Sequence, residues 1–247
     1  MNNFGRRVYG FGAITLGLVG LAFHDFALVW QPVPQGVPHR LALAYVTAAA
    51  LALAGTAVNF RRTAAVGCAA LVGLYAAFIL LMHGPRVLAH PLTFQPWAGV
   101  AEQLALAAAG ALALASVARL GAASAARLAR LARAAFAICL VVFGLAHFVY
   151  PAATAAYVPR WLPPGQLFWA YATGAAHIAA GLALLAGVLA RLSAISLTVM
   201  FVGFGILVHA PALLASPFSH LAWTSNAMNL ALIGAAWVVT DSLGRRR

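Results

Sequence analysis

The sequence predicts an all-α polytopic membrane protein, with eight transmembrane helices arranged as two parallel four-helix repeats. Composition gives the first reason: hydrophobic residues make up 64% of the 247 residues, enough for about eight spans of roughly 20 residues each. Charged residues make up only 7%, against roughly 25% in an ordinary soluble domain. A soluble fold would expose so much apolar surface that it would aggregate. Composition therefore excludes a soluble enzyme, a disordered chain and a disulfide-stapled secreted module.

Proline clusters and short polar turns divide the chain into apolar spans. The predicted spans cover residues 8–30, 39–58, 64–82, 97–117, 133–150, 167–189, 192–210 and 221–240. Proline lacks an N–H donor and clashes with the preceding helical turn, so its clusters mark the first, third, fifth and seventh connections. On this basis we expect no proline inside the helices. We retain the first span as a helix because it is too long for a signal peptide and no small-residue cleavage site follows it.

The distribution of arginine predicts the topology. All fifteen basic residues are arginine, and the formal net charge is +12. Twelve of them lie at the two termini and in the second, fourth and sixth connections, whereas Arg40, Arg86 and Arg160 lie on the opposite side. Because positively charged loops remain in the cytoplasm, both termini are expected to be cytoplasmic. In a membrane protein the positions of the basic residues indicate which loops are cytoplasmic. We therefore expect no nucleic-acid partner despite the net positive charge.

The two halves of the chain resemble each other at an offset of 126 residues. Residues 44–55 and 170–181 share seven identities in twelve, and residues 81–106 and 207–232 share eleven in twenty-six. The matches include His83 with His209 and Pro85 with Pro211. Each half has an even number of predicted helices, so both enter the membrane in the same direction. We therefore predict repeats over 1–115 and 133–247, joined by a cytoplasmic linker over 116–132.

The second half resembles a four-helix DoxX-like membrane domain. The pattern consists of Arg133 at the start of a helix, the stretches Gly144 to Phe148, Val158 to Pro163 and Gly174 to Gly181, and a turn over Arg191 to Ala194. The resemblance implies a multi-pass protein of the bacterial inner membrane. Some relatives are similar to the small subunit of thiosulfate:quinone oxidoreductase, which implies an accessory or quinone-facing component of a membrane redox system. Its partners would be the lipid bilayer and another membrane or periplasmic redox protein.

Histidines dominate the polar residues that could carry chemistry. All but one of the eight fall in outer loops or at the outer ends of predicted helices, and only His177 lies deep within a span. Neutral imidazole binds metal ions and haem iron and hydrogen-bonds to quinones. The ends of the first and third helices of a four-helix unit can converge, so we predict that His147 and His209 share one ligand or metal ion. Alternatively, these histidines are ordinary interfacial residues.

Ionisable groups within spans add further candidates. Glu102 lies about one turn inside the outer end of the fourth span, which predicts a polar pocket open to the outside, unless Glu102 reaches the interface or pairs with Arg40 or Arg86. Cys68 and Cys139 are expected to be packing residues. The full set of candidate ligand-binding residues is His24, Asp25, His83, Glu102, His147, His177 and His209.

Three hypotheses follow from these observations. The first is a quinone-facing redox component with quinone or haem as its ligand. The second is a small-solute transporter built on the tandem repeat, although transporters usually have interrupted helices at matching positions of their repeats. The third is a non-catalytic membrane scaffold subunit.

Overall fold

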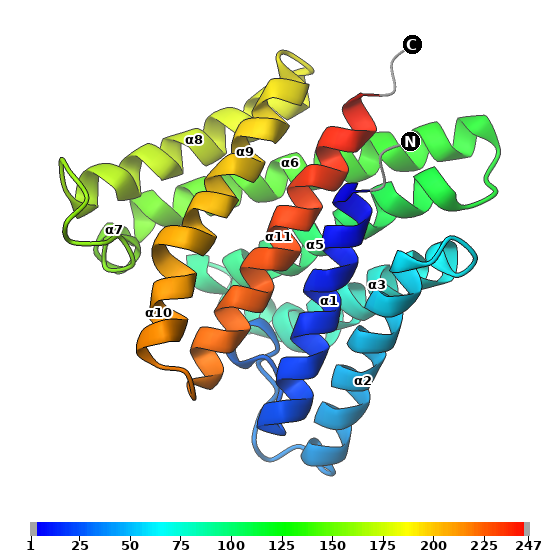
Figure 1. Cartoon of the computed structure of the whole chain (residues 1–247), viewed down its shortest axis with the longest axis horizontal. Helices are drawn as coiled ribbons and strands as arrows, with labels where there is room; N and C mark the ends of the chain where they lie inside the picture. The colour runs from blue at the N-terminus through cyan, green and yellow to red at the C-terminus, as the bar shows by residue number, and fades with distance from the viewer. Residues whose placement is uncertain (1–3, 245–247) are drawn as a thin grey trace.

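The computed structural model describes residues 4–244, and this part of the chain contains helices and connections but no strand. Within residues 4–244, eight long helical segments follow one another, and Figure 1 shows their arrangement. They are α1 (Phe4–Phe23), α2 (Arg40–Asn59), α3 with α4 (Ala64–Phe78 and Gly84–Ala89), α5 (Phe94–Val117), α6 (Ala122–Val149), α8 (Gln166–Ala186), α9 with α10 (Ala190–Phe204 and Ala210–Ala215) and α11 (His220–Leu243). Two short elements, η1 (Leu28–Trp30) and α7 (Pro151–Ala155), lie in connections.

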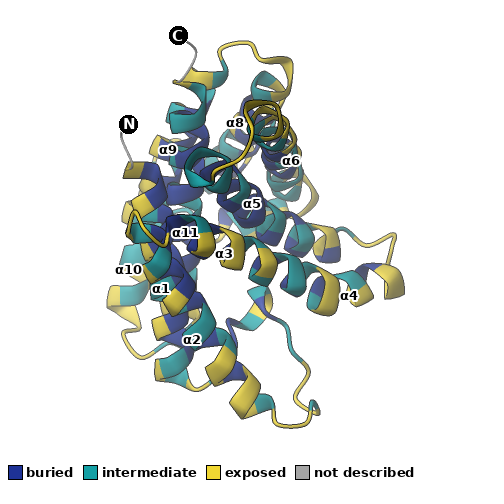
Figure 2. Ribbon diagram, turned by 90° about the vertical axis from the view of Figure 1, so that its right-hand side faces the viewer, coloured by how far each residue is buried: buried dark blue, intermediate teal, exposed yellow. Residues whose placement is uncertain are grey.

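Six of these segments are long and apolar enough to cross a bilayer: α2, α3 with α4, α5, α6, α8, and α9 with α10. The prediction of an all-α membrane protein is confirmed. The α1 helix is not among the six, and it carries Arg6 and Arg7 in its first turn. Neither is α11, which carries several amide and hydroxyl side chains. Of the six, α9 with α10 is the least enclosed by the rest of the protein and α5 is the most enclosed. Figure 2 shows many buried residues along α5.

Two predicted helix boundaries are wrong. The first helix ends at Phe23 rather than near residue 30, because the chain turns inward at His24, whose φ of 55° is left-handed. The fifth span begins at Ala122, so most of the segment predicted as a linker is helical. Alanine, leucine and arginine are strong helix formers, and their density here extends α6 by several turns.

The expectation that proline is absent from helix interiors is also wrong. A π-helical turn over Ile79–His83 joins α3 to α4, and a second over Gly205–His209 joins α9 to α10. Each turn ends two residues before a proline, Pro85 or Pro211, in a helix that continues past it. A proline ring clashes with the carbonyl four residues earlier, and a wider turn relieves that clash without ending the helix.

The eight segments pack as a ring in which each contacts its neighbours in sequence, and α11 closes the ring against α1. Across the ring, α5 contacts α11. The fourth long helix of each half therefore packs on the first helix of the other half: α11 on α1, and α5 on α6. The two halves are thus interlocked rather than separate four-helix bundles.

Small residues allow this close packing. A Cβ on Gly234 of α11 would lie 2.2 Å from the backbone nitrogen of Tyr9, and a Cβ on Gly12 of α1 would lie 2.4 Å from Cα of Ala231. Lipid offers no hydrophobic drive for helix association, so such contacts hold the bundle together through packing. They also bring the beginning of α1 to the end of α11, where the Gly5 N–H donates to Asp241 Oδ2 at 3.2 Å.

The helix boundaries recur at the offset seen in the sequence. Residues 126 positions apart begin α2 and α8, α3 and α9, and α5 and α11, and the π-helical turns show the same offset. The contacts between neighbouring helices also correspond, since α1–α2, α2–α3 and α3–α5 match α6–α8, α8–α9 and α9–α11. These correspondences are consistent with the predicted duplication.

Candidate functional site

His147 and His177 form the most concentrated polar feature within the second half. His147 lies near the end of α6 and His177 near the middle of α8, and their ring centroids are 5.5 Å apart. His177 is 3% exposed and His147 is half-buried. The pair lies within the part of the bundle that would be surrounded by lipid, where a polar side chain is a functional candidate by default.

Backbone carbonyls fix the tautomer of both rings. His147 Nδ1 lies 2.9 Å from the carbonyl oxygen of Ala170, and His177 Nδ1 lies 2.9 Å from that of Thr173. A carbonyl oxygen can only accept, so each Nδ1 is the N–H donor and each neutral ring has its lone pair on Nε2. Neither Nε2 has a hydrogen-bond partner among residues 4–244. Each ring therefore has an acceptor nitrogen without a partner among the described residues, and the two ring centroids are 5.5 Å apart.

Aromatic side chains surround His177. Its ring centroid is 5.6 Å from that of Phe201 and 6.1 Å from those of Phe143 and Phe204. These rings come from α6 and α9, so three helices contribute to the surroundings of the imidazole pair. An apolar enclosure with a few convergent polar atoms is the usual composition of a small-molecule site.

Two glycines bring α6 and α8 together at this level. A Cβ on Gly174 would lie 2.7 Å from the Cβ of His147, and a Cβ on Gly144 would lie 2.5 Å from the carbonyl oxygen of Gly174. Any larger side chain would separate the helices and therefore the two imidazoles. The glycine-rich stretches of the sequence thus position the histidines.

The structure places the imidazole of His147 beside that of His177, whereas the sequence predicted that His147 and His209 would share a ligand. His147 contacts His177, whereas the described contact of His209 is made by its carbonyl oxygen, which accepts from Asn226 Nδ2 at 2.8 Å. His209 lies at the end of the π-helical turn on α9, where it is half-buried. The sequence indicated that both histidines were candidate ligand-binding residues, but it could not indicate which helix faces would contact each other.

The first half holds a different polar cluster around the carbonyl oxygen of Trp30. This oxygen accepts from His83 Nε2 at 3.1 Å and from Gln103 Nε2 at 2.8 Å. The Trp30 side chain also hydrogen-bonds to Glu102. Both His83 and Gln103 are almost fully buried, and Gln103 Oε1 has no partner. Glu102 therefore does not pair with Arg40 or Arg86 but lies beside the indole of Trp30.

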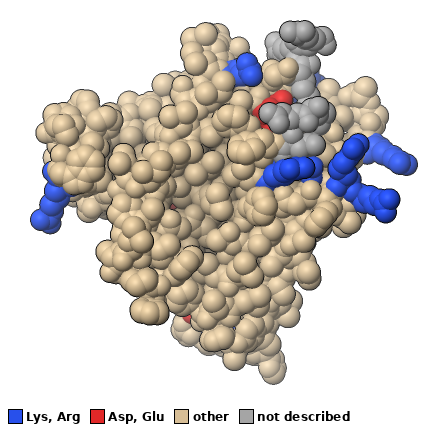
Figure 3. Space-filling view, in the orientation of Figure 1, with Lys and Arg blue, Asp and Glu red and all other residues tan. Residues whose placement is uncertain are grey.

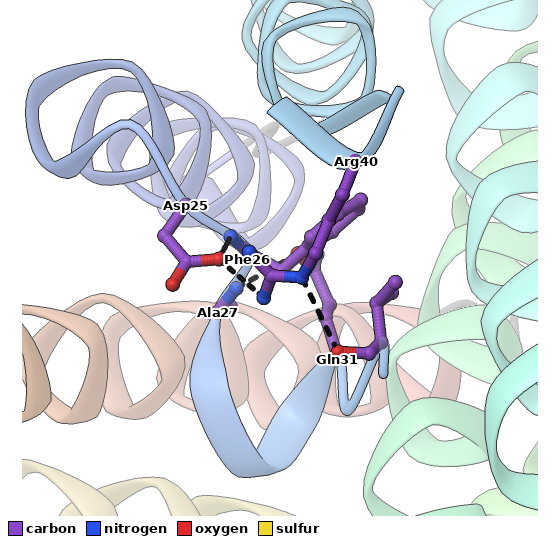
Figure 4. Close-up of polar contacts among 6 residues, drawn as sticks. Asp25, Phe26, Ala27, Gln31 and Arg40 are labelled. Carbon is purple, nitrogen blue, oxygen red and sulfur yellow. Dashed lines mark hydrogen bonds and ion pairs between the residues drawn. The ribbon is translucent and has the colours of Figure 1, made fainter. Parts of the chain in front are cut away.

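Asp25 and His24 make separate contacts rather than acting together. Asp25 Oδ1 accepts from Arg40 at 2.6 Å and from the N–H of Phe26 at 2.6 Å, as Figure 4 shows. The guanidinium of Arg40 also lies over the Phe26 ring, 5.3 Å from its centroid. His24 Nδ1 bonds instead to Tyr45 at 2.6 Å. Asp25 thus bonds to Arg40 and Phe26 rather than to its neighbour His24, and the carboxylate holds the α1–α2 connection closed.

No group of three or more histidine, cysteine or acidic side chains within residues 4–244 could hold a metal ion. Cys68 and Cys139 are both buried and unbonded, consistent with their predicted packing role. Arginine side chains gather near the two chain ends (Figure 3). The opposite, arginine-poor end of the bundle carries the connections with Arg40, Arg86 and Arg160.

Comparison with protein families identifies one segment of the chain. Residues 128–210 match the DoxX family model. The DoxX-like pattern recognised in the sequence is thereby confirmed for this segment, which runs through α6, α8 and α9 and includes both His147 and His177. The comparisons with curated proteins and with solved structures give no match.

Within the DoxX segment, sequence analysis identified the two histidines but not the residues that orient them. Ala170 contacts His147 through its carbonyl oxygen, whereas Thr173 contacts His177 through its carbonyl oxygen and His147 through its hydroxyl, which lies 3.3 Å from Nδ1. The spacing of four residues between Thr173 and His177 is one helical turn, and this was the available indication. Phe201 and Phe204 appeared to be ordinary apolar residues of a span.

Proposed function

We propose that the protein is a membrane redox component that binds the head group of a quinol between α6, α8 and α9. The observation that carries this proposal is the pair of Nε2 lone pairs on His147 and His177, fixed by the two Nδ1 bonds. A quinol hydroxyl is a donor, so it matches a neutral imidazole acceptor. The flat ring of the quinol also matches the aromatic surroundings of His177.

The membrane topology that we propose is the one predicted from the distribution of arginine in the sequence. All eight long segments cross the bacterial inner membrane, including α1 and α11, and both termini are cytoplasmic. The two halves are parallel repeats with interlocked fourth helices. In this proposal another membrane or periplasmic redox protein exchanges electrons with the bound quinol.

The experiment is calorimetric titration of the detergent-solubilised full chain with a short-chain benzoquinol. We expect His147→Ala and His177→Ala each to weaken binding by about fivefold to tenfold, the equivalent of one hydrogen bond. His90→Ala is the matched control, because His90 is exposed in the α4–α5 connection. His209→Ala should leave quinol affinity unchanged if His147 and His177 bind the head group, and should lower it if His147 and His209 do.

Equal binding by the wild type and both histidine variants would contradict the proposal. Failure of the wild type to bind any quinol, with the fold intact by circular dichroism, would favour the scaffold hypothesis instead.

A small-solute transporter is the second candidate, and one observation favours it. The matched π-helical turns over Ile79–His83 and Gly205–His209 are helix irregularities at equivalent positions of the two halves. Such matched irregularities are typical of transporters built from repeats. A cysteine introduced at Val208 would then react with a membrane-impermeant maleimide from either side as the protein alternates. Reaction from one side alone would argue against transport.

A further inference from the structure

The two halves differ sharply at the arginine-poor end. In the first half, the α1–α2 connection folds inward, burying Phe26, Ala27 and Gln31, and the Asp25–Arg40 ion pair fastens it. At the corresponding positions of the second half, Pro151 and Gln166 replace Asp25 and Arg40. The α7–α8 connection therefore lacks the ion pair that closes its counterpart.

A cavity of about 420 Å³ lies at this place in the second half. It is open on one side and is lined by the α7–α8 connection and by the π-helical turn that follows α9, with walls that include Tyr157, Arg160, Ile206 and Leu207. Ala156, which also lines the cavity, corresponds to Trp30 of the first half. Replacing an indole with a methyl group is one reason that the second half has space here.

Arg160 brings an unneutralised positive charge to this cavity. The chain has three acidic residues, and each is engaged elsewhere: Asp25 with Arg40, Glu102 beside Trp30, and Asp241 with Gly5 at the opposite end. Arg160 itself is exposed and forms no ion pair with a described residue. Residues 4–244 therefore supply no acidic side chain to Arg160, which is free to bind an anionic group of another molecule.

The remaining walls indicate an amphipathic anion. Ile206 is 65% exposed and belongs to the α9–α10 segment, which is apolar enough to cross a bilayer, so this wall faces lipid chains. Tyr157 and Trp161 are 68% and 71% exposed, as expected of rings at a membrane–water interface. The cavity thus joins a cation and interfacial aromatics to an apolar wall.

We propose that this cavity binds an anionic phospholipid, with the phosphate of the head group at Arg160 and an acyl chain against the π-helical turn of α9. Guanidinium is well suited to phosphate because its N–H groups form a planar fork. We place the site in the second half alone, because in the first half Pro34 stands at the position of Arg160 and Trp30 at that of Ala156.

The test is native mass spectrometry of the detergent-solubilised full chain titrated with phosphatidylglycerol, phosphatidylcholine or inorganic phosphate. We expect the protein to retain phosphatidylglycerol in preference to phosphatidylcholine. Arg160→Gln should weaken phosphatidylglycerol binding about fivefold, as expected for one arginine at a membrane surface. Arg86→Gln is the matched control, because Arg86 is equally exposed at the same end but does not line the cavity.

Ala156→Trp provides a second variant that keeps the charge and restores the indole of the first half. It should also weaken retention of phosphatidylglycerol. The proposal is overturned if Arg160→Gln and Arg86→Gln have the same effect, which would indicate general surface attraction. Retention of both lipids to the same degree, or displacement of the lipid by inorganic phosphate at equal concentration, would also overturn it.

Discussion

Replacing Gly174 with alanine should damage the imidazole site through a single methyl group. The new Cβ would lie 2.7 Å from the Cβ of His147, 3.1 Å from Cε2 of Phe148 and 3.2 Å from the carbonyl oxygen of Gly144. Ordinary contacts begin at 3.4 Å, so His147 and α6 must move away from α8 by about 0.7 Å. Such overpacking costs about 1–3 kcal/mol.

Two effects of this substitution can be separated. Alanine recovers up to about 1 kcal/mol of helix propensity, which leaves a net loss of about 0–2 kcal/mol in the free energy of unfolding. A displacement of about 0.7 Å also exceeds the roughly 0.5 Å tolerance of a preorganised site. We therefore expect quinol affinity to fall about tenfold, with a lower melting temperature in the same detergent.

Gly203→Ala is the control for this experiment. Gly203 lies on α9, and a Cβ there would meet nothing within 4 Å. This variant gains the same helix propensity without the collision, so its melting temperature and quinol affinity should match or slightly exceed those of the wild type. If Gly174→Ala behaves like Gly203→Ala in both measurements, α6 and α8 do not approach as described, and the reasoning fails.

Three further predictions concern the bundle as a whole. Reporter fusions after Arg62 and Arg247 should be cytoplasmic and a fusion after Arg160 should be external, and an external signal at the C-terminus would disprove the topology. Asp25→Asn should lower the free energy of unfolding by at most about 1 kcal/mol, because the ion pair is partly exposed; a much larger loss in a thermal melt would indicate a role beyond closing the connection. Co-expressed fragments divided within residues 118–121 should co-purify, because α11 packs on α1 and α5 on α6, whereas independent recovery of each fragment as a stable monomer would contradict the interlocked ring.

Composition and periodic breaks were sufficient to predict an all-α membrane protein, because a bilayer requires long apolar segments whatever their contacts. Most helix boundaries could also be predicted, since proline and arginine mark connections locally. The last residue of α1 could not be predicted, because it depends on the left-handed conformation of His24. The first residue of α6 could not be predicted either, because helix-forming residues extend this helix beyond its apolar span. The π-helical turns were missed because a proline appears in the sequence as an end rather than as a local widening of a continuing helix.

The sequence by itself determined that histidines would be the main polar residues and that the second half is DoxX-like. Only the tertiary structure decided that His147 meets His177 rather than His209. The reason is that residue type is a local property, whereas the pairing depends on which faces of α6 and α8 meet. That meeting is decided by the glycine contacts between the helices and by backbone carbonyls that fix each ring.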